Sequence, residues 1–116
     1  MRLIVCGGRS FRDQDAVDRT LDAFLQKYGA SLVIVHGAAT GADMCAHQWA
    51  LSRCVRVEPY PANWKAERRA AGPNRNRRML ETGVQGVLAF PGGTGTENMI
   101  SQAHKAGVFV WRFFYA

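Results

Sequence analysis

The stretch GVLAFPGGTGTENMISQAHKAG, residues 86–107, decides the fold class of this chain. It begins with an apolar run typical of a buried strand, and it ends with Met99, Ile100 and Ala103 at the spacing of one helix face. Three glycines lie between the two elements. Such glycines either make a tight connection or clear side chains away so that backbone N–H groups can touch a ligand. The stretch predicts a strand–turn–helix unit and leaves both explanations of its glycines open.

The same order of strand, turn and helix recurs along the whole chain. We expect strands at residues 2–6, 31–35, 54–61, 86–90 and 107–114, and helices near 13–29, 42–50, 73–82 and 94–106. Thr94 or Thr96 is expected to cap the last helix. Continuous apolar strands are typical of a parallel sheet covered on both faces. The sequence therefore predicts an α/β, Rossmann-like three-layer sandwich with a mostly parallel five-stranded sheet, in one domain over residues 1–116.

Composition narrows the class of protein. The 116 residues are 47% hydrophobic and 21% charged, with a formal net charge of +6 that favours anionic partners. No apolar run is long enough to span a membrane, and we expect no signal peptide. The three cysteines show no CxxC spacing, which indicates a reducing, cytoplasmic location rather than a disulfide-bonded secreted fold. We expect Cys6 and Cys45 to be buried in the core.

Three glycine-bearing turns are expected to meet at one edge of the sheet. They are GGRSF at residues 7–11, HGAATGAD at 36–43 and PGGTGT at 91–96, and each follows a predicted strand. The carboxyl ends of parallel strands share one edge, where open α/β sheets bind ligands. Each turn opens a helix, whose free N–H groups and positive dipole end favour a phosphate or carboxylate. The three turns together predict an anion-binding rim, with hydroxyl donors from Thr94 and Thr96.

The familiar nucleotide motifs are absent. Neither a Walker A sequence nor GxGxxG occurs, since GTGTEN ends in Asn98, which argues against a motor ATPase, a kinase or a standard NAD dehydrogenase. A basic segment does precede the third turn, and it contains Lys65, Arg68, Arg69, Arg75, Arg77 and Arg78. We expect Arg75 to contact the ligand, because guanidinium groups match phosphate oxygens. The other five residues are expected mostly at the surface.

Several titratable side chains are candidates for chemistry at the rim. His36 either orients a ligand or steadies its turn, and Asp43 either accepts a ribose hydroxyl or favours a helix N-terminus. His47 and His104 are expected on helix surfaces with no role. As catalytic carboxylates, Asp43, Glu97 and Glu67 are weak candidates, and no Ser-His-Asp arrangement is discernible. No residue set has the spacing of metal ligands, so we predict no metal.

The motifs GGRSF, HGAATGAD, PANWKAERRAAGPNRNRRM and FPGGTGT resemble the SLOG superfamily, and within it the small YspA/YpsA-like branch. The resemblance implies a Rossmann-like domain that binds a nucleotide or nucleotide-derived molecule, with no further cofactor, in bacteria or phages. The binding residues that it implies are Gly7, Gly8, Arg9, Ser10, Phe11, His36, Gly37, Ala38, Gly41, Ala42, Asp43, Arg75, Asn76, Pro91, Gly92, Gly93, Thr94, Gly95 and Thr96.

Four positions depart from the pattern of the family. Ala38 and Arg68 stand where glycine is usual, and Asn63 stands where aspartate is usual. Met99 stands at the glutamate of PGGxGTxxE, the motif of the phosphoribohydrolases in the superfamily, which argues against that activity. Glu97 lies about 200° around the helix from position 99 and would not easily replace this glutamate.

Three functions follow as hypotheses, in this order. The first is a sensor or signal-binding protein for a mononucleotide or an ADP-ribose-like molecule, and not an enzyme. The second is a phosphoribohydrolase that cleaves the N-glycosidic bond of a nucleoside monophosphate. The third is a protein that binds single-stranded nucleic acid, for which the net charge is the motive. We also expect a homodimer or larger oligomer, because the apolar C-terminal run VFVWRFFYA, residues 108–116, provides an edge for association.

Overall fold

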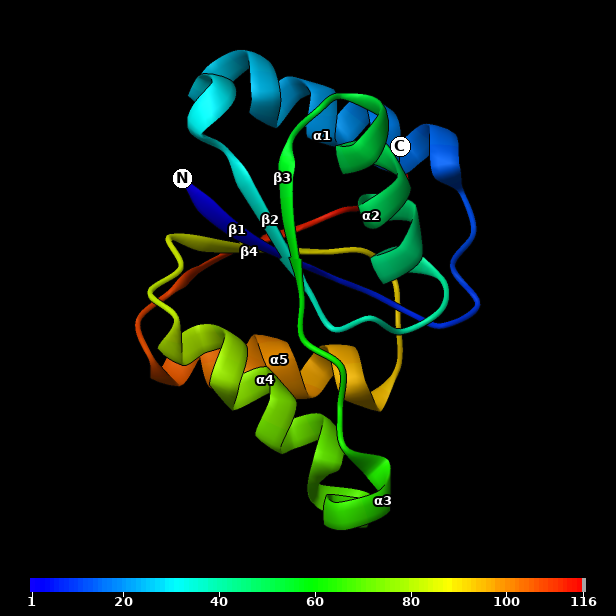
Figure 1. Ribbon diagram of the computed structural model, residues 1–116, viewed down its shortest axis with the longest axis vertical. Helices are drawn as coiled ribbons and strands as arrows, with labels where there is room; N and C mark the ends of the chain where they lie inside the picture. Colours follow the sequence, from blue (N-terminus) through cyan, green and yellow to red (C-terminus); the bar gives the residue numbers. More distant parts are fainter. Residues whose placement is uncertain (116) are drawn as a thin grey trace.

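Five strands form one parallel sheet in the computed structural model, which describes residues 1–115 (Figure 1). Ala116, the last residue of the C-terminal apolar run, lies outside the described residues. The strands are β1 (Arg2–Cys6), β2 (Val33–His36), β3 (Arg56–Pro59), β4 (Gly86–Ala89) and β5 (Phe109–Arg112). Their order is β3-β2-β1-β4-β5, and every neighbouring pair is parallel. The predicted α/β, Rossmann-like fold is confirmed.

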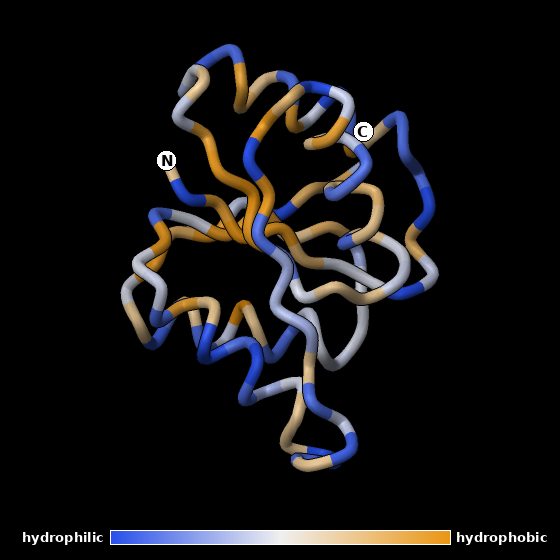
Figure 2. The backbone as a smooth tube through the Cα atoms, viewed as in Figure 1, coloured by the Kyte–Doolittle hydropathy of each residue, from blue (hydrophilic) through white to orange (hydrophobic). Residues whose placement is uncertain are grey.

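Helices cover both faces of the sheet (Figure 1). One face carries α1 (Gln14–Tyr28) and α2 (Ala42–Ser52), and the other carries α4 (Ala71–Glu81) and α5 (Thr94–Lys105). Side chains alternate along β1, so that Leu3 and Val5 pack in the first core and Ile4 and Cys6 in the second. The strands are therefore apolar throughout, and Figure 2 shows the hydrophobic segments gathered at the sheet between the helical layers.

The strand order creates a gap at the carboxyl edge. β1 lies between β2 and β4, and the chain leaves β1 toward α1 on one face but leaves β4 toward α5 on the opposite face. Two connections that diverge in this way leave a crevice between them, where open α/β sheets bind ligands. The fold therefore positions a site between the loops that follow β1 and β4.

Several element boundaries differ from the predicted ones. Residues 29–31 form a short 3-10 turn, so β2 begins two residues later than expected, and β3 and β5 are shorter at both ends. The polar stretch before the third long helix contains a short helix α3 (Trp64–Glu67) and a second 3-10 turn at residues 68–70. Pro73 lies in the first turn of α4, where its missing N–H has no intrahelical acceptor. These differences arise in local turns. Such turns have no apolar periodicity, so a prediction from periodicity does not place them.

The prediction that Thr94 or Thr96 caps α5 is wrong. The N-cap is Gly93, Thr94 is the first helical residue, and in the described chain the N-cap makes no capping hydrogen bond through a side chain. The side chain of Thr96 instead turns inward and is buried. The first N–H of this helix with an intrahelical acceptor is that of Glu97, which donates to the carbonyl oxygen of Gly93 at 3.0 Å. The preceding N–H groups of the turn are left without protein acceptors.

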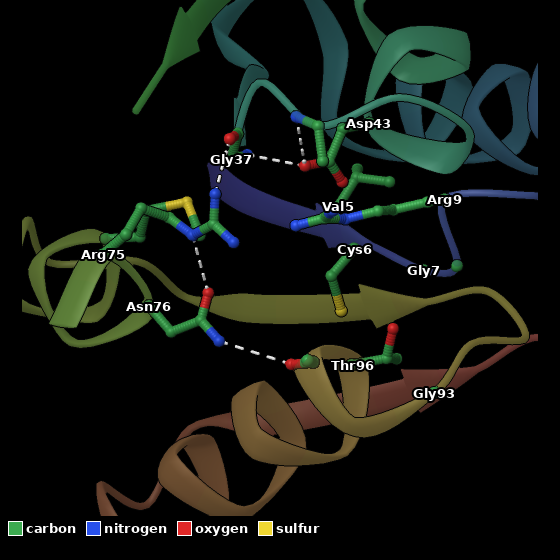
Figure 3. Close-up of a pocket in the computed structure, with 14 residues that line it drawn as sticks. Val5, Cys6, Gly7, Arg9, Gly37, Asp43, Arg75, Asn76, Gly93 and Thr96 are labelled. Atoms are coloured by element: carbon green, nitrogen blue, oxygen red, sulfur yellow. Dashed lines mark hydrogen bonds between the residues drawn. The ribbon is translucent and has the colours of Figure 1, made fainter. Parts of the chain in front are cut away.

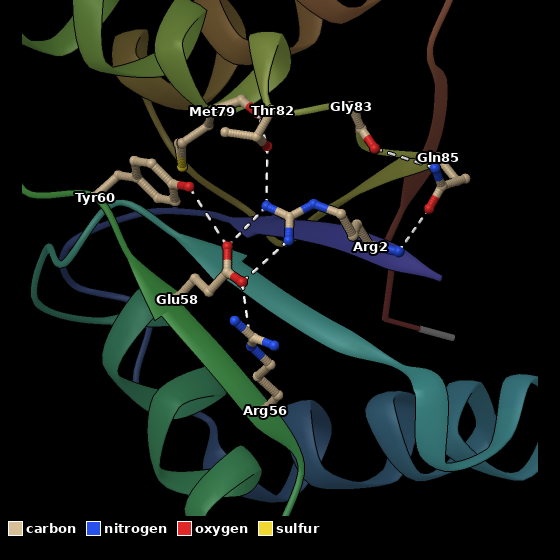
Figure 4. A network of polar contacts seen from close by, with 8 residues as sticks. All are labelled: Arg2, Arg56, Glu58, Tyr60, Met79, Thr82, Gly83 and Gln85. Atoms are coloured by element: carbon tan, nitrogen blue, oxygen red, sulfur yellow. Dashed lines mark hydrogen bonds and ion pairs between the residues drawn. The ribbon is translucent and has the colours of Figure 1, made fainter.

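A half-buried ion pair joins the edge strand β3 to the rest of the sheet (Figure 4). Glu58 accepts hydrogen bonds from two nitrogens of Arg2 at 2.8 and 3.1 Å, and it also contacts Arg56 at 3.3 Å. Arg2 donates in addition to the hydroxyl of Thr82 at 3.0 Å, which joins β1 to the end of α4. Glu58 thus pairs with two arginines, of which Arg2 is half-buried and Arg56 is exposed. The network is structural and lies apart from the carboxyl edge of the sheet.

Two further sequence expectations concern the cysteines and the membrane. Cys6 and Cys45 are buried, as predicted for core residues, and Cys54 is exposed. None of the helices in residues 1–115 combines the length and the apolar composition that crossing a membrane requires.

Candidate functional site

A narrow pocket of about 100 Å³ lies at the carboxyl edge, between the turns that follow β1, β2 and β4 (Figure 3). All three glycine-bearing turns contribute to it, as the sequence predicts for loops at one edge of a parallel sheet. Its walls contain ten of the residues proposed from the sequence: Gly7, Gly8, Arg9, Gly37, Asp43, Arg75, Asn76, Gly93, Gly95 and Thr96. The three turns are therefore neighbours in space.

Two wider hollows adjoin this pocket, and Arg9 lines all three. One, of about 620 Å³, is bordered by residues 8–12 and 91–93, and it includes Ser10, Phe11, Pro91 and Gly92 from the predicted set. The other, of about 300 Å³, is bordered by residues 37–39, Arg75 and the segment that follows β3, and it includes Ala38. His36, Gly41, Ala42 and Thr94 line none of the three spaces. A phosphate-sized group fits the central pocket, and the remainder of a larger ligand has room on either side.

Asp43 is the carboxylate of the pocket, and it also holds the turn after β2. Its Oδ2 atom accepts the backbone N–H groups of Gly37 at 3.0 Å and Ala39 at 3.2 Å. Burial is the main influence on this side chain, which is 5% exposed, and it raises the pKa of Asp43 to about 6 against the opposing effect of the two N–H donors. The second oxygen, Oδ1, accepts no hydrogen bond within residues 1–115.

Gly41, which precedes Asp43, is required by the backbone. Its φ of +80° lies in the left-handed region, and a Cβ there would collide with the carbonyl oxygens of Gly8 and Arg9. The N–H of Ala42 donates to the same Gly8 oxygen at 3.2 Å. The turns after β1 and β2 therefore touch through their backbones. Gly41 and Ala42 act on the pocket by fixing this contact, although they do not line it.

Arg75 and Asn76 join the turn after β2 to the turn after β4. Arg75 donates from Nη1 to the carbonyl oxygen of Gly37 and from Nε to Asn76 Oδ1 at 2.9 Å. Asn76 is buried and donates to the carbonyl oxygen of Gly95 at 3.3 Å (Figure 3). A Cβ on Gly37 would occupy the place of the Arg75 guanidinium, so glycine is needed for this close approach. α4 thus holds both turns at a fixed separation.

Two guanidinium groups face each other across the pocket. In Figure 3 the side chains of Arg9 and Arg75 reach inward from opposite sides. Burial is the main cause that lowers the pKa of Arg75, and the positive charge of Arg9 lowers it further. A bound anion reduces the electrostatic repulsion between two like charges that lie close together. The pocket is therefore electrostatically suited to a negatively charged group.

Free backbone donors lie at the start of α5, where Gly93, Gly95 and Thr96 line the pocket. The N–H groups of Gly93, Thr94, Gly95 and Thr96 find no acceptor among residues 1–115. They precede the first intrahelical hydrogen bond and lie at the positive end of the helix dipole. Not every rim amide is free, because Gly8 donates to Pro91 and Ala38 donates to His36. The turn after β4 presents the longest run of free N–H groups on the described rim.

His36 steadies its turn, and His47 has a role that the sequence analysis missed. The backbone N–H of Ala38 donates to His36 Nδ1 at 2.9 Å, which requires the proton of the neutral ring to be on Nε2. His36 Nε2 lies 2.9 Å from His47 Nδ1, so His36 is the donor of this pair. Burial, followed by His47 and Arg75, lowers the pKa of His36 to about 4. His47 is half-buried and packs edge-on against His36, contrary to the expectation of a surface position without a role. A histidine at helix spacing gives no sign of such a partner.

The other candidate carboxylates lie outside the pocket. Glu97 is exposed and forms an ion pair with Arg112 at 2.9 Å, facing β5. Glu67 accepts hydrogen bonds from Asn74 at 2.9 Å and Arg78 at 3.4 Å. Met99 is fully buried in the core between the sheet and the α4–α5 layer. Neither Glu97 nor the side chain at position 99 can reach a ligand in the pocket. In the described chain Asp43 is the one carboxylate that lines it.

The basic segment divides as the sequence predicts. Arg75 lines the pocket, whereas Lys65, Arg68, Arg69 and Arg77 are exposed and Arg78 is half-exposed. Arg77 points away from the pocket and forms an ion pair with Glu81 at 3.6 Å, and Arg78 forms an ion pair with Glu67 of α3 at 3.4 Å. Only one arginine of this run therefore contributes charge to the pocket.

Seven residues that line the central pocket or the hollow beside Arg75 escaped the sequence analysis as site residues: Val5, Cys6, Ala39, Pro61, Ala62, Trp64 and Met79. Cys6 ends β1 at the pocket floor (Figure 3), and burial followed by the charge of Asp43 raises the pKa of its thiol. A neutral thiol is a poor nucleophile. Trp64 follows β3 and is therefore at the same sheet edge, which the order of strands could have indicated. Within residues 1–115 no group of His, Cys, Asp or Glu side chains has the arrangement of a metal site.

Comparisons with known proteins agree with this geometry. The family model of the YspA, cpYpsA-related SLOG family matches residues 1–66. The chain is 35% identical to the gene 61 protein of Mycobacterium phage D29, over 97% of this chain and 95% of that protein. Its fold is similar to the X-ray structure of DNA processing protein A (DprA) from Streptococcus pneumoniae, with a TM-score of 0.80 at 20% identity. That match covers 99% of this chain and spans half the length of the Streptococcus protein.

Proposed function

The chain belongs to the YspA, cpYpsA-related SLOG family, and from this membership and the geometry of the pocket we propose that it binds a nucleotide or nucleotide-derived molecule. The phosphate lies in the central pocket, and the rest of the ligand extends into the adjoining hollows. A mononucleotide and an ADP-ribose-like molecule both suit this arrangement. Binding itself, and not turnover, is the function that we propose, in a sensor or signal-binding protein.

The observation that carries the proposal is the set of free N–H groups at the start of α5. Four consecutive amides, at residues 93–96, lack acceptors within the described chain, and three of these residues, Gly93, Gly95 and Thr96, line the pocket at the sheet edge. Free amides at a helix N-terminus are suited to the oxygens of a phosphate. Arg9 and Arg75 approach the same pocket and add two positive charges. A phosphate satisfies the amides and separates the charges of the two arginines.

Two of the three glycines of the turn, Gly93 and Gly95, support a ligand rather than a tight connection, whereas a Cβ at Gly92 would collide with Thr96 and with the backbone nitrogen of Gly8. A Cβ added at Gly93 or Gly95 would meet nothing within 4 Å, and both residues have a backbone φ outside the left-handed region. The fold therefore does not require glycine at these two positions. Both residues line the pocket, so their missing side chains leave room for an incoming group. This favours the chemical explanation of the glycine-rich turn.

Asp43 is placed to recognise a sugar. Its Oδ2 atom is engaged by the turn, and Oδ1 is available to accept a hydrogen bond from a ribose hydroxyl. A ribose that is linked to a phosphate in the pocket is close enough for one of its hydroxyl groups to reach this side chain. We propose that Asp43 selects ligands with a sugar hydroxyl over inorganic phosphate.

The alternative of N-glycosidic hydrolysis finds less support. It calls for a carboxylate at the glycosidic bond in addition to groups that bind the phosphate. Glu97 points away toward Arg112, position 99 is a buried methionine, and Asp43 already accepts two backbone hydrogen bonds. Chromatography of AMP after long incubation tests this alternative. Adenine release that exceeds the release by an Asp43→Ala control would favour the enzyme over the sensor.

Calorimetry and thermal unfolding test the binding proposal directly. We expect a panel of the four nucleoside monophosphates and ADP-ribose to include a member that raises the melting temperature. At a hundredfold excess over Kd the stabilisation is about 2.7 kcal/mol, or roughly 10 °C for a chain of this size. Arg9 is exposed, and its side chain makes no hydrogen bond among the described residues. The substitution Arg9→Ala therefore removes a positive charge from the pocket without breaking a side-chain hydrogen bond. It should weaken binding at least tenfold.

The matched control is Arg77→Ala. Arg77 is an arginine of the same chain that is exposed on the far side of α4 and pairs with Glu81 at 3.6 Å. Its removal lowers the net charge by the same amount without touching the pocket. An equal effect of both substitutions, or no thermal shift with any ligand of the panel, would contradict the proposal.

A further inference from the structure

We propose that the hollow beside Trp64 is a base subsite, in which a nucleobase stacks on the indole ring while its phosphate occupies the central pocket. This inference rests on the proposed function and names the part of the ligand that provides specificity. Trp64 is 49% exposed at the start of α3, immediately after the turn that follows β3. The hollow of about 300 Å³ that it lines is continuous with the phosphate pocket through Arg9, Gly37 and Arg75.

The position of the indole ring is fixed by the capped backbone of α3 and by a contact at the edge of the ring. Asn63 caps α3 by accepting the N–H of Ala66 at 3.2 Å, which fixes the backbone at the start of this short helix. The edge of the ring lies against Gly72 in the first turn of α4, where an added Cβ would be 3.5 Å from the indole carbon Cη2. A half-exposed aromatic ring that is fixed at its edge can serve as a stacking platform for a base.

Arg9 lies over the face of this ring. Its guanidinium carbon lies 5.4 Å from the centre of the Trp64 ring. The same side chain lines the phosphate pocket, so one arginine serves both places. We infer that a phosphate draws the Arg9 guanidinium away from the indole, and that the base takes the position that Arg9 leaves. The cation–π contact is thereby replaced by base stacking and by a charged hydrogen bond.

The remaining walls of the hollow suit a planar base. Pro61 and Ala62 are small and apolar, and residues 37–39 contribute backbone from the turn after β2. Side chains with a negative charge are absent from the described lining of this hollow. The chemical class that fits is a nucleoside phosphate with an aromatic base, in preference to a sugar phosphate without one.

A competing role for Trp64 is to position Arg9 for the phosphate, and two ligands separate the roles. Titration calorimetry compares ribose 5-phosphate, which has no base, with the monophosphate of the panel that binds tightest. If the base stacks on Trp64, Trp64→Ala weakens the nucleotide about tenfold or more and leaves ribose 5-phosphate unchanged, while Trp64→Phe retains most of the affinity. Equal weakening of both ligands, or no weakening of the nucleotide, overturns the base subsite.

Intrinsic fluorescence gives a second, independent readout. The chain has three tryptophans, of which Trp49 is buried beside α1 and Trp111 lies on β5. A stacked base should quench Trp64, so we expect nucleotide-dependent quenching that disappears in Trp64→Phe and persists in the matched control Trp111→Phe. Quenching that persists in Trp64→Phe overturns the inference. Failure of every nucleotide to bind the unaltered protein refutes the proposed function itself, whereas binding without loss in Trp64→Ala refutes only the base subsite.

Discussion

The Oδ2 atom of Asp43 accepts the backbone N–H of Gly37 at 3.0 Å, so a residue at the start of α2 holds the turn that ends β2. The same Gly37 accepts a hydrogen bond from Arg75 through its carbonyl oxygen. One turn of the rim is therefore fixed through its N–H by a carboxylate and through its C=O by a guanidinium. This arrangement links the stability of the fold to the protonation of Asp43.

Asp43 should make stability decrease as the pH rises through its titration. Burial raises its pKa from 3.8 to about 6, so the folded state holds this proton more tightly than the unfolded state does. The stabilisation is complete below pH 3.8 and is lost as the pH rises through about 6. Relative to the unaltered protein, Asp43→Asn should gain on the order of 3 kcal/mol of unfolding free energy between pH 4 and pH 7. Urea unfolding measures this difference, and a difference independent of pH would contradict it.

His36 has the opposite dependence. Burial lowers its pKa from 6.5 to about 4, so its contribution to stability is complete above pH 6.5 and is lost as the pH falls toward 4. In the unaltered protein the two residues oppose each other over this range. The stability of Asp43→Asn should therefore show a steeper rise with pH than that of the unaltered chain.

Gly41→Ala should destabilise the protein, whereas Gly93→Ala should affect binding alone. Gly41 has a φ of +80°, and a Cβ there would collide with the backbone of residues 8 and 9, so we expect a loss of about 3 kcal/mol. A Cβ at Gly93 meets nothing within 4 Å, so stability should change by less than about 0.5 kcal/mol. The added methyl group nevertheless enters the pocket and should weaken nucleotide binding. Urea unfolding and calorimetry on both variants check this division.

Ala38→Gly and Arg68→Gly should each stabilise the fold. Ala38 has a φ of +58° and Arg68 a φ of +51°, which place two side chains in the left-handed region. The resemblance to the family implies glycine at both positions, and the left-handed backbone is a physical reason for it. We expect a gain of about 0.5–1 kcal/mol for each substitution. Ala39→Gly is the control, since φ at Ala39 is not positive, and it should lose a similar amount.

Met99→Glu should disrupt the core without creating a hydrolase. The side chain at this position is fully buried among Ile4, Cys6 and Val87, where a carboxylate has no partner. We expect a loss of at least about 3 kcal/mol in unfolding free energy and no release of base from AMP. Met99→Leu keeps the volume and should cost less than about 1.5 kcal/mol. A stable Met99→Glu variant with phosphoribohydrolase activity would contradict the conclusion that the side chain at position 99 faces the core and not the pocket.

The outer edge of β5 predicts self-association. Among the described strands β5 pairs with β4 alone, and Phe109 on this edge strand is 61% exposed. An unpaired edge beside an exposed aromatic side chain favours pairing with a second copy. Sedimentation should give a mass above the 12.8 kDa of one chain. Phe109→Lys should shift the equilibrium toward the monomer, and a monomeric unaltered protein would show that this edge is not an interface.

Local patterns were sufficient to predict the fold and the rim. Each apolar run stops at a glycine-bearing turn, and the parallel order of strands then requires the three turns to share an edge. The prediction failed where a distant partner decides the outcome. In the sequence His47 resembles any surface histidine, and only the fold brings its Nδ1 atom within 2.9 Å of His36 Nε2. Glu97 pairs with Arg112, which lies fifteen positions later on β5. Thr94 and Thr96 have the residue type of a cap, but the turn places Gly93 at that position.

The amino-acid sequence by itself determined the elements, the parallel sheet and the edge at which the glycine turns meet, because apolar periodicity and turn residues act over a few neighbouring positions. The tertiary structure decided which donors remain free and which side chains face the pocket. Those outcomes depend on pairs such as Arg75 with Gly37, which lie 38 positions apart and meet only when the sheet and the α4–α5 layer pack together.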